Sequence, residues 1–231
     1  MSWQTLEDAR SEAMTCTRCR LSGGRTQVVW MDGNAASPLM FVGEAPGFHE
    51  DKQGLPFVGA AGQLLDTMLG SIGLDRTGCC ICNVLKCRPP GNRDPLPDEI
   101  EKCRPYLEAQ MHFIRPRVMV TLGNFATRFV LDRQVSISRV RGQRFTVNGV
   151  TVIPTFHPAA LLHGGGASSP SMPLFRDDFR LVAQVLTETQ AALQPEAQPA
   201  QPEPEPAPGP ELAPGPELAP EAEGFAQEAL F

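Results

Sequence analysis

The sequence lacks any apolar run approaching the roughly 20 residues that a membrane-spanning helix needs. Its hydrophobic content of 42% is nevertheless enough for a buried core. The first residues, MSWQTLEDARSEAM, also lack the basic and then apolar pattern of a secretory signal. Seven cysteines without such a signal indicate a reducing compartment, in which thiols bind metals or lie in the core and seldom form disulfides.

Basic residues are absent from the end of the chain. Residues 191–231 contain eight of the 26 acidic residues, all Glu. The rest of the chain therefore has 18 acidic and 20 basic residues. The net charge of −6 therefore hides a weakly basic remainder, which is compatible with a nucleic-acid partner. The same segment holds ten of the 23 prolines and repeats PGPELA at 208–213 and 214–219. We expect a folded domain over 1–190 and a disordered tail over 191–226.

Helical and strand-like apolar patterns alternate along the first 190 residues. Helices are predicted over 4–15, 59–72, 97–114, 125–131 and 173–189, and strands over 27–30, 39–42, 79–85, 117–122 and 144–153. Asn148-Gly149 is a favoured hairpin dipeptide and predicts a turn inside the last strand region. Strands that alternate with helices indicate an α/β fold with a mostly parallel sheet covered on both faces.

The loop over 43–59 follows one predicted strand and leads into a helix. Gly43 and Gly47 allow the backbone to approach a ligand closely, and Phe57 offers a flat apolar surface. Ligands of open α/β sheets bind at the carboxyl ends of the strands, where this loop lies. An ordinary strand-to-helix connection is the alternative.

Polar or aromatic side chains lie at or just after the ends of three of the predicted strands: Glu44 with Phe57, then Asn83, then His157. In a parallel sheet these strand ends share one edge. Phe57 could stack on a planar ring, Asn83 could form paired hydrogen bonds with a base edge, and His157 could donate to a developing oxyanion. Together they describe a pocket for a flipped base. The alternatives are a core aromatic, a strand-end cap and a surface histidine.

Four cysteines have a spacing typical of metal ligands. Cys16 and Cys19 form a Cys-x2-Cys pair, and Cys87 and Cys103 follow in a Pro-rich loop and on a helix. Such a set could hold zinc or a [4Fe–4S] cluster, and spacing alone does not separate the two. The alternative is that some are core thiols. That alternative suits the strand cysteines better, which are Cys79, Cys80 and Cys82.

Five stretches in this order resemble the family 4 uracil-DNA glycosylases, the iron–sulfur branch of the uracil-DNA glycosylase superfamily. They are GEAPG at 43–47, PFVG at 56–59, NVLKCRPPGNR at 83–93, CRPYL at 103–107 and HPAALL at 157–162. The resemblance covers about residues 4–189. It implies a three-layer α/β/α fold and a structural [4Fe–4S] cluster on Cys16, Cys19, Cys87 and Cys103, with zinc disfavoured.

The resemblance also implies an activity: the enzyme flips uracil out of single- or double-stranded DNA and hydrolyses its N-glycosidic bond, leaving an abasic site for base excision repair. Backbone groups of Gly43, Glu44 and Ala45 would hold the base, Phe57 would stack on it, and Asn83 would pair with its O4/N3 edge.

Three further roles follow from the same resemblance. Glu50 matches a position beside C5 of the base, and His157 would stabilise charge on O2. Leu161 or Leu162 would wedge into the duplex. The family 1 enzymes have an aspartate where this chain has Ala45. Either Glu44 or Glu50 therefore assists the water, or stabilisation of the departing uracil by His157 supplies most of the rate.

The sequence departs from the family pattern at His163 and the Gly-rich run after it, and at His49. The last residues, 227–231 (QEALF), resemble a bacterial sliding-clamp binding motif, with a merely apolar chain end as the alternative. We expect a monomer without membrane contact, acting on the chromosome in a bacterial or archaeal cytoplasm. The rival interpretations are a nucleic-acid-binding module without activity and a related glycosylase for hypoxanthine or mismatched thymine.

Overall fold

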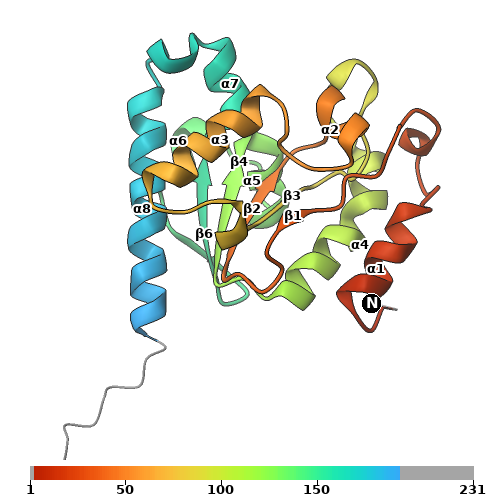
Figure 1. The fold of residues 1–231 in the computed structure, drawn as a ribbon, viewed down its shortest axis with the longest axis horizontal. Helices are drawn as coiled ribbons and strands as arrows, with labels where there is room; N and C mark the ends of the chain where they lie inside the picture. Colours follow the sequence, from red (N-terminus) through yellow and green to blue (C-terminus); the bar gives the residue numbers. More distant parts are fainter. Residues whose placement is uncertain (1–2, 193–231) are drawn as a thin grey trace, which may run out of the picture. The chain divides into compact units, whose positions relative to one another are not determined.

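The computed structural model describes residues 3–192. Its elements alternate along the chain as the sequence predicts (Figure 1). The α-helices are α1 (Leu6–Met14), α2 (Phe48–Gln53), α3 (Ala60–Ser71), α4 (Pro97–Ile114), α5 (Gly123–Leu131), α6 (Ile137–Val140), α7 (Pro158–His163) and α8 (Met172–Ala191). The strands are β1 (Asp32–Gly33), β2 (Leu39–Gly43), β3 (Cys80–Asn83), β4 (Val118–Leu122), β5 (Phe145–Val147) and β6 (Val150–Thr155). Short 3₁₀ turns are η1 (Arg20–Gly23), η2 (Arg76–Gly78), η3 (Pro90–Asn92) and η4 (Gly166–Ser168).

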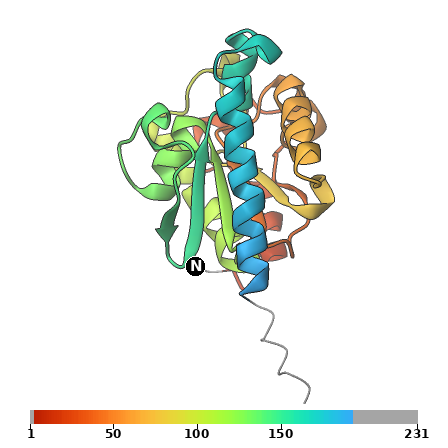
Figure 2. The same cartoon turned by 90° about the vertical axis from the view of Figure 1, so that its left-hand side faces the viewer.

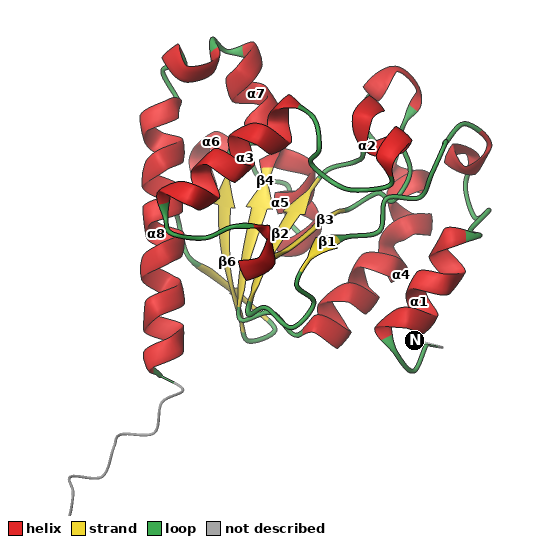
Figure 3. Ribbon diagram, viewed as in Figure 1, coloured by secondary structure: helices red, strands yellow, loops and turns green. Residues whose placement is uncertain are grey.

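The strands form one sheet in the order β1-β3-β2-β4-β6-β5. The four inner strands run parallel, and only the edge strands β1 and β5 are antiparallel. The prediction of a mostly parallel sheet is therefore confirmed. The arrowheads of β2, β4 and β6 point to one edge of the sheet, where α2 and α7 also lie (Figure 3). That edge gathers the residues that follow each strand.

Helices cover both faces of the sheet, which gives three layers. On one face, Phe41 of β2 stacks on Phe179 of α8 with ring centroids 5.9 Å apart, and α3 packs beside α8 (Figure 2). On the other face, Met40 and Val42 pack against α4 and α5. All five residues of β2 are buried, because both of its faces lie under helices. The α/β/α architecture implied by the resemblance is thus confirmed.

The strand predicted over 27–30 is wrong. This segment forms a single backbone bond to its neighbour, from the Val29 N–H to the Lys86 carbonyl at 2.8 Å. Val28 and Trp30 pack instead into the core between α1 and α4. The edge strand is β1, two residues further on. Three consecutive apolar residues indicated burial here, and the burial is against helices.

The acidic stretch after Gly47, predicted as loop, is the short helix α2. Gly54 ends it in the left-handed conformation at φ 73°, and its N–H bonds back to the Glu50 carbonyl. Glycine adopts this conformation without steric cost, so the helix stops where the sequence supplies one. The turn predicted at Asn148-Gly149 is confirmed, with both residues at positive φ.

Residues 193–231 lie outside the described part of the chain. They hold nearly all of the predicted tail and the whole of the predicted clamp-binding peptide at 227–231. Among residues 3–192, no helix combines the length and the apolar composition needed to cross a bilayer.

Candidate active site

The base site, defined here as Gly43, Glu44, Phe57, Asn83 and His157, lies at the carboxyl ends of the parallel strands. Gly43 and Asn83 are direct neighbours across β2 and β3. A Cβ on Gly43 would overlap the Asn83 Oδ1 atom and lie 2.5 Å from Cζ of Phe57. Glycine is therefore required at position 43, because the Asn83 amide and the Phe57 ring both pack directly against its backbone.

Asn83 presents an unused acceptor inside the protein. The residue is only 2% exposed, and its Oδ1 atom has no hydrogen-bond partner. A buried polar atom without a partner costs about 1–3 kcal/mol, so such an atom calls for a functional explanation. A ligand that brings an N–H group to this point would supply the missing bond.

His157 follows β6 and is half-buried. Its ring faces that of Phe57, with centroids 5.7 Å apart and planes inclined by 28°. The Nδ1 atom accepts the N–H of Ala159 at 3.2 Å, which leaves the ring proton on Nε2. Burial lowers the pKa of His157 to about 4, although the charge of Glu50 acts in the opposite direction. The imidazole is therefore neutral at pH 7 and offers one N–H donor.

The β6 end that carries His157 is fixed from α8. Thr155 donates its hydroxyl to Asp178 at 2.5 Å, and Arg141 forms an ion pair with the same buried carboxylate. A second support comes from Gly123, at φ 86°, where a Cβ would lie 3.0 Å from that of His157. Gly123 follows β4 and lies between the predicted strand over 117–122 and the predicted helix over 125–131. Its place after a fourth parallel strand was the signal that could have identified it.

The carboxylates of Glu44 and Glu50 differ in their surroundings. Burial, reinforced by the charge of Asp94, raises the pKa of Glu44 to about 7, so this group titrates near neutrality. Glu50 lies on α2 and accepts the N–H groups of Val58 and Gly59 with one oxygen, both at 2.9 Å. Glu50 therefore caps the start of α3 and holds the loop that carries Phe57.

The two leucines predicted for the wedge lie in different environments. Leu161 is 2% exposed and belongs to the core under α3 and α8, whereas Leu162 is 36% exposed. Both lie on α7, which begins directly after His157. Leu162 is thus the member of the pair that faces solvent.

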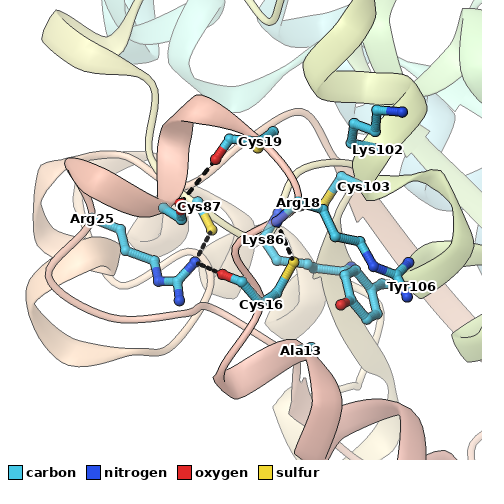
Figure 4. Close-up of a pocket in the computed structure, with 11 residues that line it drawn as sticks. Ala13, Cys16, Arg18, Cys19, Arg25, Lys86, Cys87, Lys102, Cys103 and Tyr106 are labelled. Atoms are coloured by element: carbon cyan, nitrogen blue, oxygen red, sulfur yellow. Dashed lines mark hydrogen bonds between the residues drawn. The ribbon is translucent and has the colours of Figure 1, made fainter.

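The cysteine pocket, lined by Cys16, Cys19, Cys87 and Cys103, lies between η1, the loop after β3 and α4 (Figure 4). Three of its sulfurs accept hydrogen bonds from nitrogen donors. The Arg18 N–H reaches Cys16 at 3.5 Å, the Arg25 guanidinium reaches Cys87 at 3.4 Å, and the Lys86 N–H reaches Cys103 at 3.3 Å. Donors of this kind stabilise thiolate sulfur.

Lys86 is the most unusual neighbour of this pocket. It is 2% exposed, so its ammonium group is not available at the surface for a DNA phosphate. Its ammonium group donates to the Asn83 carbonyl and to Oε1 of Gln110, both at 2.6 Å. Lys86 therefore connects the base site to the cysteine pocket.

The donor set fits a thiolate-bound group. Burial raises the pKa of Cys103 to about 12 and also raises that of Cys87, so free thiols here stay protonated, and a bound cation would be needed to ionise them. Within the described residues, no three His, Cys, Asp or Glu side chains are arranged to hold a single ion. The thiols surround a cavity, as the ligands of a cluster do when each binds a different iron. Cys79, Cys80 and Cys82 lie in the sheet core, as expected.

Comparison with known proteins gives the family. Residues 30–180 match the uracil DNA glycosylase superfamily. The chain belongs to this superfamily. Three type-4 uracil-DNA glycosylases are similar to it over most of their length. The protein of Archaeoglobus fulgidus is 43% identical over 82% of this chain and 98% of its own. Those of Sulfurisphaera tokodaii and Thermotoga maritima are 41% and 47% identical, over 78% and 69% of this chain and 84% of theirs. This glycosylase is thus of the type-4 group, and its base site lies within the matched residues 30–180.

Proposed function

We propose that this glycosylase extrudes uracil from DNA and hydrolyses the bond between the base and deoxyribose. The C1′–N1 bond breaks and its electron pair leaves with uracil. Water then adds to C1′ and gives up a proton, leaving an abasic site. The observation that carries this proposal is the buried Asn83 Oδ1 atom without a partner, next to an aromatic ring and a neutral imidazole donor.

Asn83 supplies the selection for uracil. Its Oδ1 atom accepts the uracil N3–H, and its amide N–H donates to O4. Cytosine presents the opposite pattern along this edge, so each mismatched buried pair costs about 1–3 kcal/mol. A planar base does not fit between rings 5.7 Å apart, so uracil enters beside the imidazole with its edges toward Asn83 and His157.

His157 supplies the main catalytic interaction. Its Nε2–H donates to O2 of the departing uracil, where negative charge develops as the bond breaks. A donor aimed at developing charge lowers the barrier by roughly 3–4 kcal/mol. Ala45 has no group that could activate water, so Glu44 serves as the acceptor for the water's proton when it is ionised. Glu50 acts through the loop that it caps.

The four cysteines of the cysteine pocket hold a [4Fe–4S] cluster. The N–H donors to three sulfurs and the enclosed position support this ligand set. The cluster ties the segment before η1 to the loop after Asn83 and to α4, and it takes no part in the hydrolysis. Brown colour, with iron and sulfide in the purified protein, would support this assignment, and bound zinc alone would contradict it.

Leu162 occupies the space that the base leaves in the duplex, because it is the exposed residue of the pair. Arg88 is a candidate phosphate contact, and its guanidinium carbon lies 5.0 Å from the ring centroid of the exposed Phe48. The prediction that 227–231 bind a sliding clamp also stands. Deletion of these five residues should abolish binding to a purified clamp without changing activity on short DNA.

Incubation with oligodeoxynucleotides that carry one uracil tests the proposed reaction. Release of free uracil and an alkali-labile abasic site are expected, in single and double strands. Matched substrates with hypoxanthine or a mismatched thymine at the same position test the rival specificities. Binding of uracil-containing DNA without release would favour the module without activity.

A further inference from the structure

Phe57 has a backbone that its residue type does not favour. Its φ of 54° lies in the left-handed region, which bulky residues adopt only when their surroundings impose it. This conformation turns the ring toward Gly43 and Asn83. The contacts that hold the two peptide groups beside Phe57 therefore decide where the ring lies.

Arg76, at the start of η2, binds the carbonyls on both sides of Phe57. Its Nη1 atom donates to the Pro56 carbonyl at 3.1 Å, and its Nη2 atom donates to the Phe57 carbonyl. The remaining donors bind two carboxylates. Asp66 of α3 accepts at 2.8 and 3.3 Å, and Asp32 of β1 accepts at 2.8 Å. All five guanidinium N–H groups are thus used, and the two aspartates fix the plane of the fork.

The peptide between Phe57 and Val58 is held at both ends. Arg76 binds its carbonyl, and Glu50 binds its N–H at 2.9 Å. Gly62 closes the third side, because a Cβ there would overlap the Phe57 carbonyl. Anchors from η2, α2 and α3 therefore converge on one peptide group.

We propose that Arg76 is a positioning residue for Phe57: with Glu50, it locks the strained backbone so that the ring is already oriented for stacking before the base arrives. This inference rests on the proposed function, since it assumes that Phe57 stacks on uracil. Base–aromatic stacking is present both before and during bond cleavage. Loss of the lock therefore raises KM more than it lowers kcat.

A double-mutant cycle tests this role. Arg76→Met should raise KM for a single-stranded oligodeoxynucleotide with one uracil by about tenfold, the lower range for loss of one stacking contact. Phe57→Ala should raise it at least as much. In the Phe57→Ala background, Arg76→Met should change KM less than twofold, because the ring that it positions is gone. Arg144→Met, which removes an exposed arginine pair with Glu188, is the matched control and should leave KM unchanged.

Gly62→Ala is a second test of the positioning role if Arg76→Met does not fold. It leaves every donor of Arg76 in place but displaces the Phe57 carbonyl. It should therefore raise KM as Arg76→Met does, and it should change KM less than twofold in the Phe57→Ala background. If either substitution raised KM equally in the wild-type and Phe57→Ala backgrounds, the positioning role would be overturned. A normal KM in Phe57→Ala would instead sink the stacking step of the proposed function.

Discussion

The base site and the cysteine pocket are adjacent, yet they differ in how far their polar atoms are hydrogen-bonded. In the base site, the Asn83 Oδ1 atom is buried without a partner, and the Phe57 backbone is strained. In the cysteine pocket, three sulfurs accept N–H groups. An unpaired acceptor and a strained backbone suit a ligand that binds and leaves. Sulfurs that already accept hydrogen bonds suit a group that stays bound. Substitutions in the two regions should therefore affect different measurements.

The largest effect on activity is expected from His157→Ala. It removes the donor aimed at O2, so kcat should fall by about 10²–10³-fold. The thermal midpoint should hardly change, because the imidazole is half-buried and bonded only to the Ala159 N–H. Asn83→Ala should also cost far more turnover than Glu44→Ala. Single-turnover uracil release from saturated single-stranded DNA measures all three. Equal losses would contradict the emphasis on the leaving group.

The largest effect on stability is expected from Cys87→Ser. Loss of one ligand should release iron and untie the loop after β3 from the N-terminal segment. A loss of ~2 kcal/mol would lower the midpoint by about 4–8 °C. Cys79→Ala is the control, since it removes a thiol that is also buried but lies in the sheet core. It should destabilise the fold without changing the iron content, and iron loss in both variants would contradict the ligand assignment.

The contrast also separates what the sequence could predict from what it could not. The sequence could predict that Glu44, Asn83 and His157 lie close together, because parallel strands bring their carboxyl ends to one edge. It could not predict the role of Lys86, because a lysine beside arginines gives no sign that its ammonium group lies inside the protein. Segment 27–30 shows the same limit, since an apolar pattern reports burial and not the partner. Arg76 binds Phe57 from 19 positions away, and only the fold brings them together.

A smaller effect is expected from Glu44→Gln, and it concerns pH. The pKa of Glu44, raised to about 7 by burial and Asp94, leaves the group protonated below neutrality and ionised above. If the carboxylate accepts a proton from water, kcat rises with pH up to about 7 and then levels. Glu44→Gln should lower kcat at pH 8 and flatten this rise. Because the pKa of His157 is lowered to about 4, the variant should stay flat down to pH 5. A remaining step near pH 6.5 would show that His157 titrates.

The smallest expected effect comes from Lys86→Met, which acts where the two regions meet. It leaves the Asn83 carbonyl and Gln110 Oε1 without their ammonium donor, and it removes a positive charge beside the cysteine pocket. KM for uracil-containing DNA should rise a few-fold, and the iron should be lost sooner on exposure to a chelator. Lys102→Met is the matched control, because Lys102 also lines the cysteine pocket but is exposed. If the charge alone matters, both variants lose iron equally and KM is unchanged. If the hydrogen bonds matter, only Lys86→Met changes KM, which would show that the cysteine pocket helps to hold the residue that recognises the base.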